Sequence, residues 1–215
     1  MSGSTATERD VLDRLEAGRI VPVVVLDDAG AATDVAAALL EGGITCIEIT
    51  LRTGAGLASI AAAAAVDGMT LGAGTVYTPG QVDQCVDAGA EFIVSPGYDD
   101  DVVARCQELG VVALPGVATA TELQRAQKTG LSEVKFFPAG QLGGLSTIIA
   151  LSQPFPSMRF MPSGGVNTAN AAEYLGHPSV FALGGSWMVP RDAVRLGDFE
   201  TVSRLSREAM ALGRT

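Results

Sequence analysis

The sequence alternates eight times between a short apolar segment, typical of a β-strand, and a longer segment typical of a helix. The strand segments are near-continuous apolar runs, as expected for strands buried on both faces, and the helices between them imply parallel pairing. Eight such units in 215 residues, without a long linker, predict an α/β fold: a (β/α)8 or TIM barrel, with residues 1–215 as a single domain. An extra amphipathic helix at about Thr7–Ala17 is expected to close one end, after a loose tail at Met1–Thr5.

An open, doubly wound sheet is the alternative that the same alternation allows. A glycine-rich phosphate-binding turn would then be expected after the first strand, but Asp27-Asp28-Ala29 follows it here. The barrel is therefore the favoured architecture. Its strands are predicted at Ile20–Leu26, Cys46–Leu51, Leu71–Thr75, Phe92–Ser95, Val111–Pro115, Glu133–Phe137, Arg159–Met161 and Val180–Leu183. Its helices are predicted at Thr33–Glu41, Gly56–Val66, Pro79–Asp87, Asp101–Leu109, Thr121–Lys128, Leu145–Leu151, Thr168–Tyr174 and Phe199–Leu212.

Charge and composition exclude several classes of function. A net charge of −10 argues against nucleic acid and anionic membranes as partners, since both need a basic surface. The first ten residues are polar and no apolar run reaches membrane-spanning length, so we expect a soluble, cytoplasmic protein. Three cysteines without a Cys-x-x-Cys pair favour a reducing compartment. The single histidine, His177, excludes His-rich zinc or iron sites.

Lys135 stands in the middle of an apolar strand, Glu133–Phe137, which Pro138 ends. Side chains alternate along a strand, so Lys135 shares one face with Glu133 and Phe137. Burial disfavours the charged form of an amine, and a neutral amine can attack a carbonyl carbon to form a Schiff base. The alternative is a lysine that runs its stem along the core and places its charge at the strand end.

Polar residues also occur near the carboxyl ends of the second and third strands, where barrel enzymes place their sites. Glu48, Thr50 and Arg52 share one face of the second strand, and we expect that face to point to the barrel axis. Glu48 can then be a general acid/base or one half of a structural ion pair. Thr75 follows the glycines of the third strand and offers a hydroxyl that can bind a carboxylate.

Two small-residue turns follow the seventh and eighth strands, Pro162–Asn167 and Leu183–Trp187. Barrels commonly bind phosphate in these two loops, through backbone N–H groups at the start of a helix. An acidic protein can hold a phosphorylated ligand in this way, without a lysine. The alternative is a pair of ordinary glycine turns.

The segments VPVVV, EITLRT, GAGTV, SPG, LPGV, VKFFPA, PSGGV and GGSWMVP resemble, in order and spacing, the 2-keto-3-deoxy-6-phosphogluconate (KDPG) aldolase family, which includes 4-hydroxy-2-oxoglutarate aldolases. The resemblance runs from about Ile20 to the C-terminal helix, and KFFPA together with EITLRT is a specific combination. It implies a class I, Schiff-base aldolase that forms a homotrimer and uses no metal or other cofactor. Such an enzyme cleaves KDPG, a phosphorylated keto acid, to pyruvate and glyceraldehyde 3-phosphate. 4-Hydroxy-2-oxoglutarate, cleaved to pyruvate and glyoxylate, is a second candidate substrate, and the choice between KDPG, its galactonate epimer and this compound stays open.

The resemblance also implies roles for individual residues. Lys135 matches the Schiff-base lysine and Glu48 the general acid/base. The implied substrate-binding residues are Arg52 and Thr75 for the pyruvate carboxylate, Pro96 and Phe137 as walls, and Gly164, Gly165, Gly185 and Ser186 on the phosphate side. Ser163 is a further candidate substrate-binding residue.

The chain departs from the family pattern in two loops that we expect at the mouth of the barrel. Gly140–Gly144 reads Gly-Gln-Leu-Gly-Gly where many relatives have Glu-Ala-Asn-Gly-Gly, and Leu26-Asp27-Asp28 stands where a basic residue is frequent. Ser163 replaces the threonine usual in gluconate-type enzymes. The sequence therefore constrains the reaction type more than the substrate range.

Two other functions compete with an aldolase on this fold. One is a barrel that binds a phosphorylated metabolite as a sensor, although a sensor does not need an inward lysine opposite an inward glutamate. The other is a phosphosugar isomerase or epimerase, which would use carboxylates without a covalent intermediate. Only the aldolase requires a Schiff base on Lys135.

Overall fold

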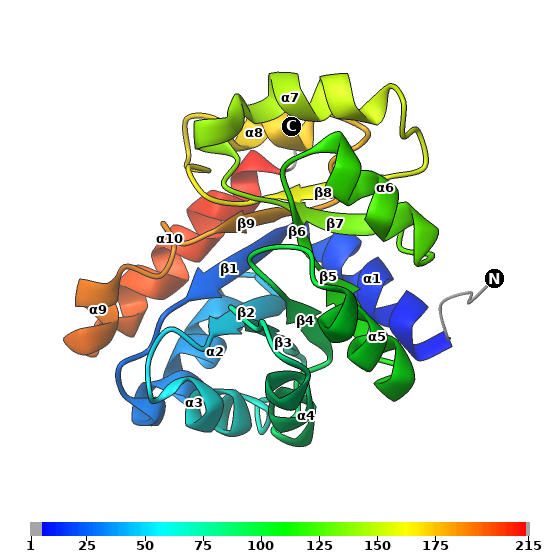
Figure 1. Ribbon diagram of the computed structural model, residues 1–215. Helices are drawn as coiled ribbons and strands as arrows, with labels where there is room; N and C mark the ends of the chain where they lie inside the picture. The colour runs from blue at the N-terminus through cyan, green and yellow to red at the C-terminus, as the bar shows by residue number, and fades with distance from the viewer. Residues whose placement is uncertain (1–5, 214–215) are drawn as a thin grey trace.

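The computed structural model describes residues 6–213, so the tail predicted at Met1–Thr5 lies outside the described residues. Short parallel strands form the centre, and helices pack around them (Figure 1). The strands are β1 (Ile20–Val24), β2 (Cys46–Thr50), β3 (Thr70–Gly74), β4 (Phe92–Val94), β5 (Val112–Leu114), β6 (Gly116–Val117), β7 (Glu133–Phe136), β8 (Arg159–Pro162) and β9 (Leu183–Gly185).

The strands close into a barrel. One sheet has the order β5-β4-β3-β2-β1-β9 and a second has the order β6-β7-β8, with parallel pairing throughout. Single bridges from Phe160 to Val180 and from Ser163 to Gly184 join the β8 side to the β9 side. At the other junction β5 and β6 are two halves of one strand. The predicted (β/α)8 barrel is confirmed.

Pro115 separates β5 from β6, because proline has no N–H group to donate to a strand ladder. β5 pairs with β4 and β6 pairs with β7, so the interrupted strand passes from one sheet to the other. The sequence predicted only its first half, as Val111–Pro115. The second half brings Gly116 into register with Lys135.

Helices cover the outside of the barrel, with α2, α3 and α4 on one side of the strands and α6, α7 and α8 on the other (Figure 1). The helical segments are α1 (Ala6–Gly18), η1 (Ala29–Ala31), α2 (Ala32–Glu41), α3 (Gly56–Ala63), α4 (Pro79–Asp87), α5 (Asp100–Leu109), α6 (Ala120–Lys128), η2 (Gly140–Leu142), α7 (Gly144–Ser152), α8 (Ala171–Leu175), α9 (Arg191–Arg195) and α10 (Phe199–Leu212).

Side-chain caps fix where three of these helices begin. The Thr78 hydroxyl accepts a hydrogen bond from the Gln81 N–H at the start of α4, where Pro79 needs no partner. The Asp99 carboxylate does the same for α5, and Thr119 and Glu122 form a capping box at α6. The caps set where the loops that follow β3, β4 and β6 end.

The extra N-terminal helix closes the end of the barrel where the strands begin. Val11 and Leu15 of α1 are buried against interior side chains such as Phe92 and Met161. The Arg159 guanidinium at the start of β8 binds the Glu16 carboxylate of α1 at 2.8 Å and 2.5 Å. Helix α1 therefore covers the end of the barrel opposite to the carboxyl ends of the strands.

Two boundaries differ from those predicted near the end of the chain. The last strand is Leu183–Gly185 rather than Val180–Leu183. Glycine has a low strand propensity, so the sequence did not indicate a strand at Gly184 and Gly185, but pairing with β1 places both in the sheet. The helix predicted at Thr168–Tyr174 begins at Ala171, since Asn167 and Asn170 hold an Asx-type turn before it. The short helix α9 was not predicted.

Candidate active site

Lys135 and Glu48 meet inside the barrel. Lys135 Nζ donates to Glu48 Oε1 at 3.3 Å, and the two side chains are 4% and 0% exposed. Both point inward from β7 and β2, as the alternation along each strand predicted. A buried amine and a buried carboxylate each need a polar partner, and here each is the partner of the other.

The third strand leaves room for this pair. A side chain at Gly74 would place its Cβ 2.1 Å from Glu48 Oε1, so only glycine fits beside the carboxylate. Glu48 Oε2 is buried and has no hydrogen-bond partner within the described residues. A buried carboxylate oxygen normally has a partner, so this one marks where a ligand hydroxyl or a water would bind.

Besides Lys135, the barrel interior holds a second potential nucleophile, the thiol of Cys46 on the inward face of β2. Cys46 is fully buried, and this burial raises the pKa of its thiol to about 11. The thiol therefore stays protonated at neutral pH and does not compete with the amine of Lys135. Thr50, on the same face, is also unavailable for chemistry, because its hydroxyl donates to the Val24 carbonyl at 3.0 Å.

Arg52 and Thr75 lie together above the pair, just beyond the ends of β2 and β3. Arg52 Nε donates to Thr75 Oγ1 at 3.4 Å, and the arginine is exposed. Thr75 has a φ of 62°, in the left-handed region that a β-branched residue rarely adopts. Such strain persists where the surroundings enforce it, and it commonly occurs at functional sites.

A cleft of about 480 Å³ opens at the carboxyl ends of the strands. Seven of the eleven predicted site residues line it: Arg52, Phe137, Ser163, Gly164, Gly165, Gly185 and Ser186. Val23 also lines it and is in register with Glu48, so the cleft floor reaches the level of the carboxylate. Phe137 lines the cleft, and its ring centroid is 5.3 Å from Lys135 Nζ.

The turn after β8 presents backbone N–H groups to this cleft. Gly164 and Gly165 both have a positive φ, at 83° and 84°. The Gly164 carbonyl accepts from the Gly140 N–H at 2.8 Å, and the Gly165 carbonyl accepts from the amides of Asn167 and Asn170 at 3.3 Å and 3.0 Å. With both carbonyls held elsewhere, the N–H groups remain for an anion. The turn, rather than the helix start that we predicted, makes this surface, because α8 begins only at Ala171.

The predicted site residues that do not line the cleft are Lys135, Glu48, Thr75 and Pro96. The first three are joined to it by the contacts described above, and Pro96 is not. It is exposed and is not among the residues that line the cleft; its carbonyl packs against Gly116 of β6. Its role as a wall stays a prediction. The sequence reasoning missed Val23, Gly184 and Arg191, which line the cleft. For Arg191, a basic residue five positions beyond Ser186, the proximity in sequence was a usable signal.

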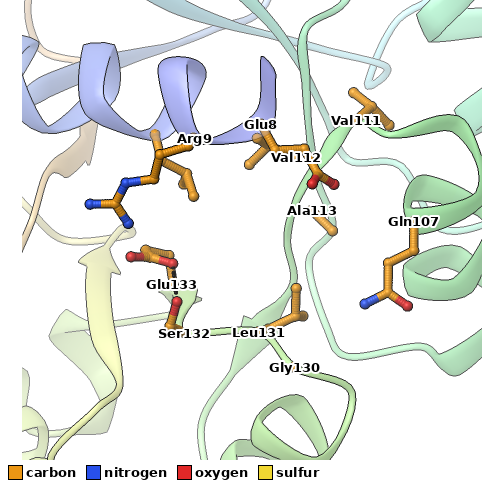
Figure 2. Close-up of a pocket in the computed structure, with 11 residues that line it drawn as sticks. Glu8, Arg9, Gln107, Val111, Val112, Ala113, Gly130, Leu131, Ser132 and Glu133 are labelled. Carbon is orange, nitrogen blue, oxygen red and sulfur yellow. Dashed lines mark hydrogen bonds between the residues drawn. The ribbon is translucent and has the colours of Figure 1, made fainter. Parts of the chain in front are cut away.

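A second, smaller cavity of about 110 Å³ lies at the opposite end of the barrel, between α1 and the starts of β5 and β7 (Figure 2). Glu133 faces it and accepts a hydrogen bond from the Ser132 hydroxyl. None of the eleven predicted site residues lines this cavity, whereas seven of them line the cleft. Lys135 and Glu48 do not line the cleft themselves, but the Phe137 ring, which does, lies beside Lys135 Nζ. The cleft at the carboxyl ends is therefore the candidate active site. Within residues 6–213, no group of three or more His, Cys, Asp or Glu residues could hold a metal ion, and no helix is long and apolar enough to cross a membrane.

Comparison with known proteins gives the same family for most of the chain. Residues 11–205 match the family described as KDPG and KHG aldolase. A 2-dehydro-3-deoxy-phosphogluconate aldolase of Treponema pallidum is 46% identical over 206 residues, covering 94% of this chain and 97% of the relative. The KHG/KDPG aldolase of Escherichia coli K12 is 40% identical over 197 residues, covering 91% and 92%.

Solved structures agree with these relatives. The KDPG aldolase of Zymomonas mobilis ZM4, crystallised with 3-phosphoglycerate, superposes with a TM-score of 0.90 at 37% identity, covering 97% of this chain and 98% of that one. The KDPG aldolase of Legionella pneumophila, with pyruvate captured as a covalent carbinolamine, gives 0.89 at 36% identity, covering 93% and 97%. The chain therefore belongs to the KDPG and KHG aldolase family.

Proposed function

We propose that this protein is a class I aldolase that cleaves KDPG to pyruvate and glyceraldehyde 3-phosphate, with Lys135 as the Schiff-base residue. The observation that carries the proposal is the buried contact of 3.3 Å between Lys135 Nζ and Glu48 Oε1 beneath the cleft. An amine and a carboxylate in contact can exchange a proton, which gives a neutral nucleophile and a general acid in one step.

The first half of the reaction builds the imine. Neutral Lys135 attacks the keto carbon, and the resulting carbinolamine loses its hydroxyl as water, with the proton supplied by Glu48. The Phe137 ring, 5.3 Å from the nitrogen, limits the access of water and stabilises the positive charge of the imine through its π face.

The second half breaks the carbon–carbon bond. Glu48, now ionised, removes the proton of the hydroxyl on the carbon of the scissile bond that becomes the aldehyde, and Oε2, which has no partner within the described residues, is the atom free to accept it. The bond electrons move to the protonated imine, the aldehyde leaves, and an enamine of pyruvate remains. Protonation of the enamine carbon and hydrolysis of the imine then release pyruvate and restore Lys135.

The two ends of the substrate are assigned to the two sides of the cleft. Arg52 and Thr75 lie near the reactive pair and would bind the carboxylate of the pyruvate portion. The N–H groups of the Gly164–Gly165 turn, with Ser163, Gly185 and Ser186, would bind the phosphate. The names of the relatives from Treponema and Escherichia, and the pyruvate adduct of the Legionella protein, support the assignment.

The assembly and location of the protein are part of the same proposal. We expect one barrel domain over residues 1–215, a homotrimer, and a place in the cytoplasm. The three cysteines are buried and unpaired, which suits a reducing compartment. Sedimentation that shows a stable monomer at micromolar concentration would remove the trimer without affecting the chemistry.

Turnover tests the proposed function directly. The purified protein is incubated with KDPG, its galactonate epimer or 4-hydroxy-2-oxoglutarate, and pyruvate is followed with lactate dehydrogenase and NADH. We expect pyruvate from KDPG, no turnover by Lys135→Met, and unchanged turnover by Lys128→Arg, which alters the only other lysine. Pyruvate release by Lys135→Met would contradict the proposal.

A further inference from the structure

The cleft is lined by two charged residues, both arginines. Arg52 lies on the side of the reactive pair, and Arg191, the first residue of α9, follows the Gly185-Ser186 turn. Arg191 takes no part in the chemistry proposed above. The other lining residues are neutral, so these two cations are the local positive charges that an anion meets in a protein of net charge −10.

Arg191 is held at the rim of the cleft by Asp27. Its Nη2 lies 2.7 Å from both Oδ1 and Oδ2 of the Asp27 carboxylate. Asp27 belongs to the loop after β1, and β1 pairs with β9, so the two loops leave the barrel side by side. The contact therefore joins the adjacent loops of the first and the last β/α units at the rim.

This ion pair is weak enough to exchange partners. The side chains of Arg191 and Asp27 are 60% and 64% exposed, and exposed ion pairs contribute little to stability. A phosphate in the cleft offers the guanidinium two oxygens in the same planar arrangement as the carboxylate, with a larger charge. Asp27, in contrast, repels that phosphate and competes for the arginine.

We propose that Arg191 is a phosphate-binding residue of this cleft, and that Asp27 positions it and sets the affinity by competing for it. The proposal rests on the proposed function, and it deepens that function by naming what selects the ligand. Arg52 for a carboxylate and Arg191 for a phosphate monoester favour a ligand that carries two separate anionic groups. A keto acid without the distant phosphate uses only the first arginine.

Binding of inorganic phosphate, measured by calorimetry, tests the proposal without any turnover. Arg191→Ala should weaken binding about five- to tenfold, as expected for the loss of one charge-assisted contact at an open site. Asp27→Asn should tighten it about two- to threefold, because a nearby negative charge is removed. In the Arg191→Ala background, Asp27→Asn should tighten phosphate binding less than it does in the unaltered protein, because the arginine that Asp27 would release is absent.

The matched controls lie on the same helix. Arg195 and Asp192 form an ion pair of similar exposure on α9 but do not line the cleft, so Arg195→Ala and Asp192→Asn should leave phosphate binding unchanged. Thermal unfolding of each variant checks that the fold is intact. Phosphate binding by Arg191→Ala equal to that by Arg195→Ala, or no phosphate binding by the unaltered protein, would overturn the proposal.

Kinetics then separate this proposal from the proposed function. For Arg191→Ala we expect kcat/KM to fall further with KDPG than with 4-hydroxy-2-oxoglutarate, which lacks a phosphate, and the loss with KDPG to appear mainly in KM. Equal losses with both substrates would count against Arg191. Absence of pyruvate from every candidate substrate would instead refute the aldolase, while the calorimetry would still decide whether Arg191 binds phosphate.

Discussion

Lys135 Nζ and Glu48 Oε1 are 3.3 Å apart, although 87 positions separate the two residues in the sequence. β7 and β2 belong to different sheets, and the pair meets because the barrel brings their inward faces together. An ion pair buried this completely is not needed for stability, since apolar residues of similar volume often serve as well. Its presence beneath an open cleft is better explained by chemistry than by folding.

Removing the charge of Glu48 should slow turnover and leave the nucleophile in place. Glu48→Gln keeps an oxygen that can accept from Lys135 but cannot take a proton from the substrate hydroxyl. Positioned proton transfer contributes a factor of about 10²–10⁴, so we expect kcat to fall by that amount. Imine formation with pyruvate, trapped by borohydride, should persist at a reduced rate.

Glu133→Gln is the matched control for this variant. Glu133 is also a buried glutamate with its side chain inside the barrel, but it faces the small cavity at the opposite end and bonds to Ser132 (Figure 2). Its turnover should remain near that of the unaltered protein. If Glu48→Gln is as active as Glu133→Gln, Glu48 is not the general acid/base.

The left-handed backbone conformation of Thr75 should reduce the stability of the folded protein. Its φ of 62° is unfavourable for any residue with a Cβ, by about 1–2 kcal/mol, and glycine avoids this cost. Thr75→Gly should therefore be more stable than Thr75→Ala by about 1 kcal/mol in urea unfolding, although glycine normally destabilises through the entropy of the unfolded chain. Both variants lack the hydroxyl and should show a raised KM. Thr75→Ala at least as stable as Thr75→Gly would show that Thr75 is not strained.

The sequence was sufficient for the barrel and for the reactive pair. Apolar runs between helical segments predicted parallel strands, and the alternation of side chains along β2 and β7 placed Glu48 and Lys135 on the barrel axis. Both inferences depend on periodicities set by the backbone alone. The residues of the glycine turns were found for a similar reason, since small residues at the carboxyl ends of strands suit a binding loop.

What the sequence did not reveal depends on contacts between distant segments. The split of the fifth strand at Pro115 becomes visible only when β4 and β7 pair with its two halves. The late start of α8 results from the Asn167 and Asn170 side chains, which bond to the backbone in the turn. Arg191 reaches the cleft because Asp27, from the other end of the chain, lies beside it.

The ion pair between Glu16 and Arg159 should make the closed end of the barrel sensitive to acid. The Arg159 guanidinium hydrogen-bonds to the Glu16 carboxyl and holds its pKa below the ordinary 4.5. A lowered pKa means that the folded state binds fewer protons, so the contribution to stability is complete above 4.5 and is lost as the pH falls through the lowered pKa.

Glu16→Gln should therefore reduce the free energy of unfolding at pH 7 by about 1 kcal/mol or less, because the pair is partly exposed. Urea unfolding at a series of pH values should show this difference shrinking in acid, and 1 M salt should reduce it at pH 7. A difference that stays constant with pH would mean that Glu16 contributes through packing rather than through its charge.

Borohydride reduction in the presence of pyruvate, read by peptide mass spectrometry, is the most direct test of the account. The chain has two lysines, Lys135 and Lys128, so the adduct can be assigned to one of them without ambiguity. We predict that the peptide with Lys135 gains the mass of a carboxyethyl group, that Lys128→Arg leaves this labelling intact, and that Lys135→Met abolishes it. Absence of the adduct on Lys135 while the protein releases pyruvate from KDPG would contradict the Schiff-base mechanism.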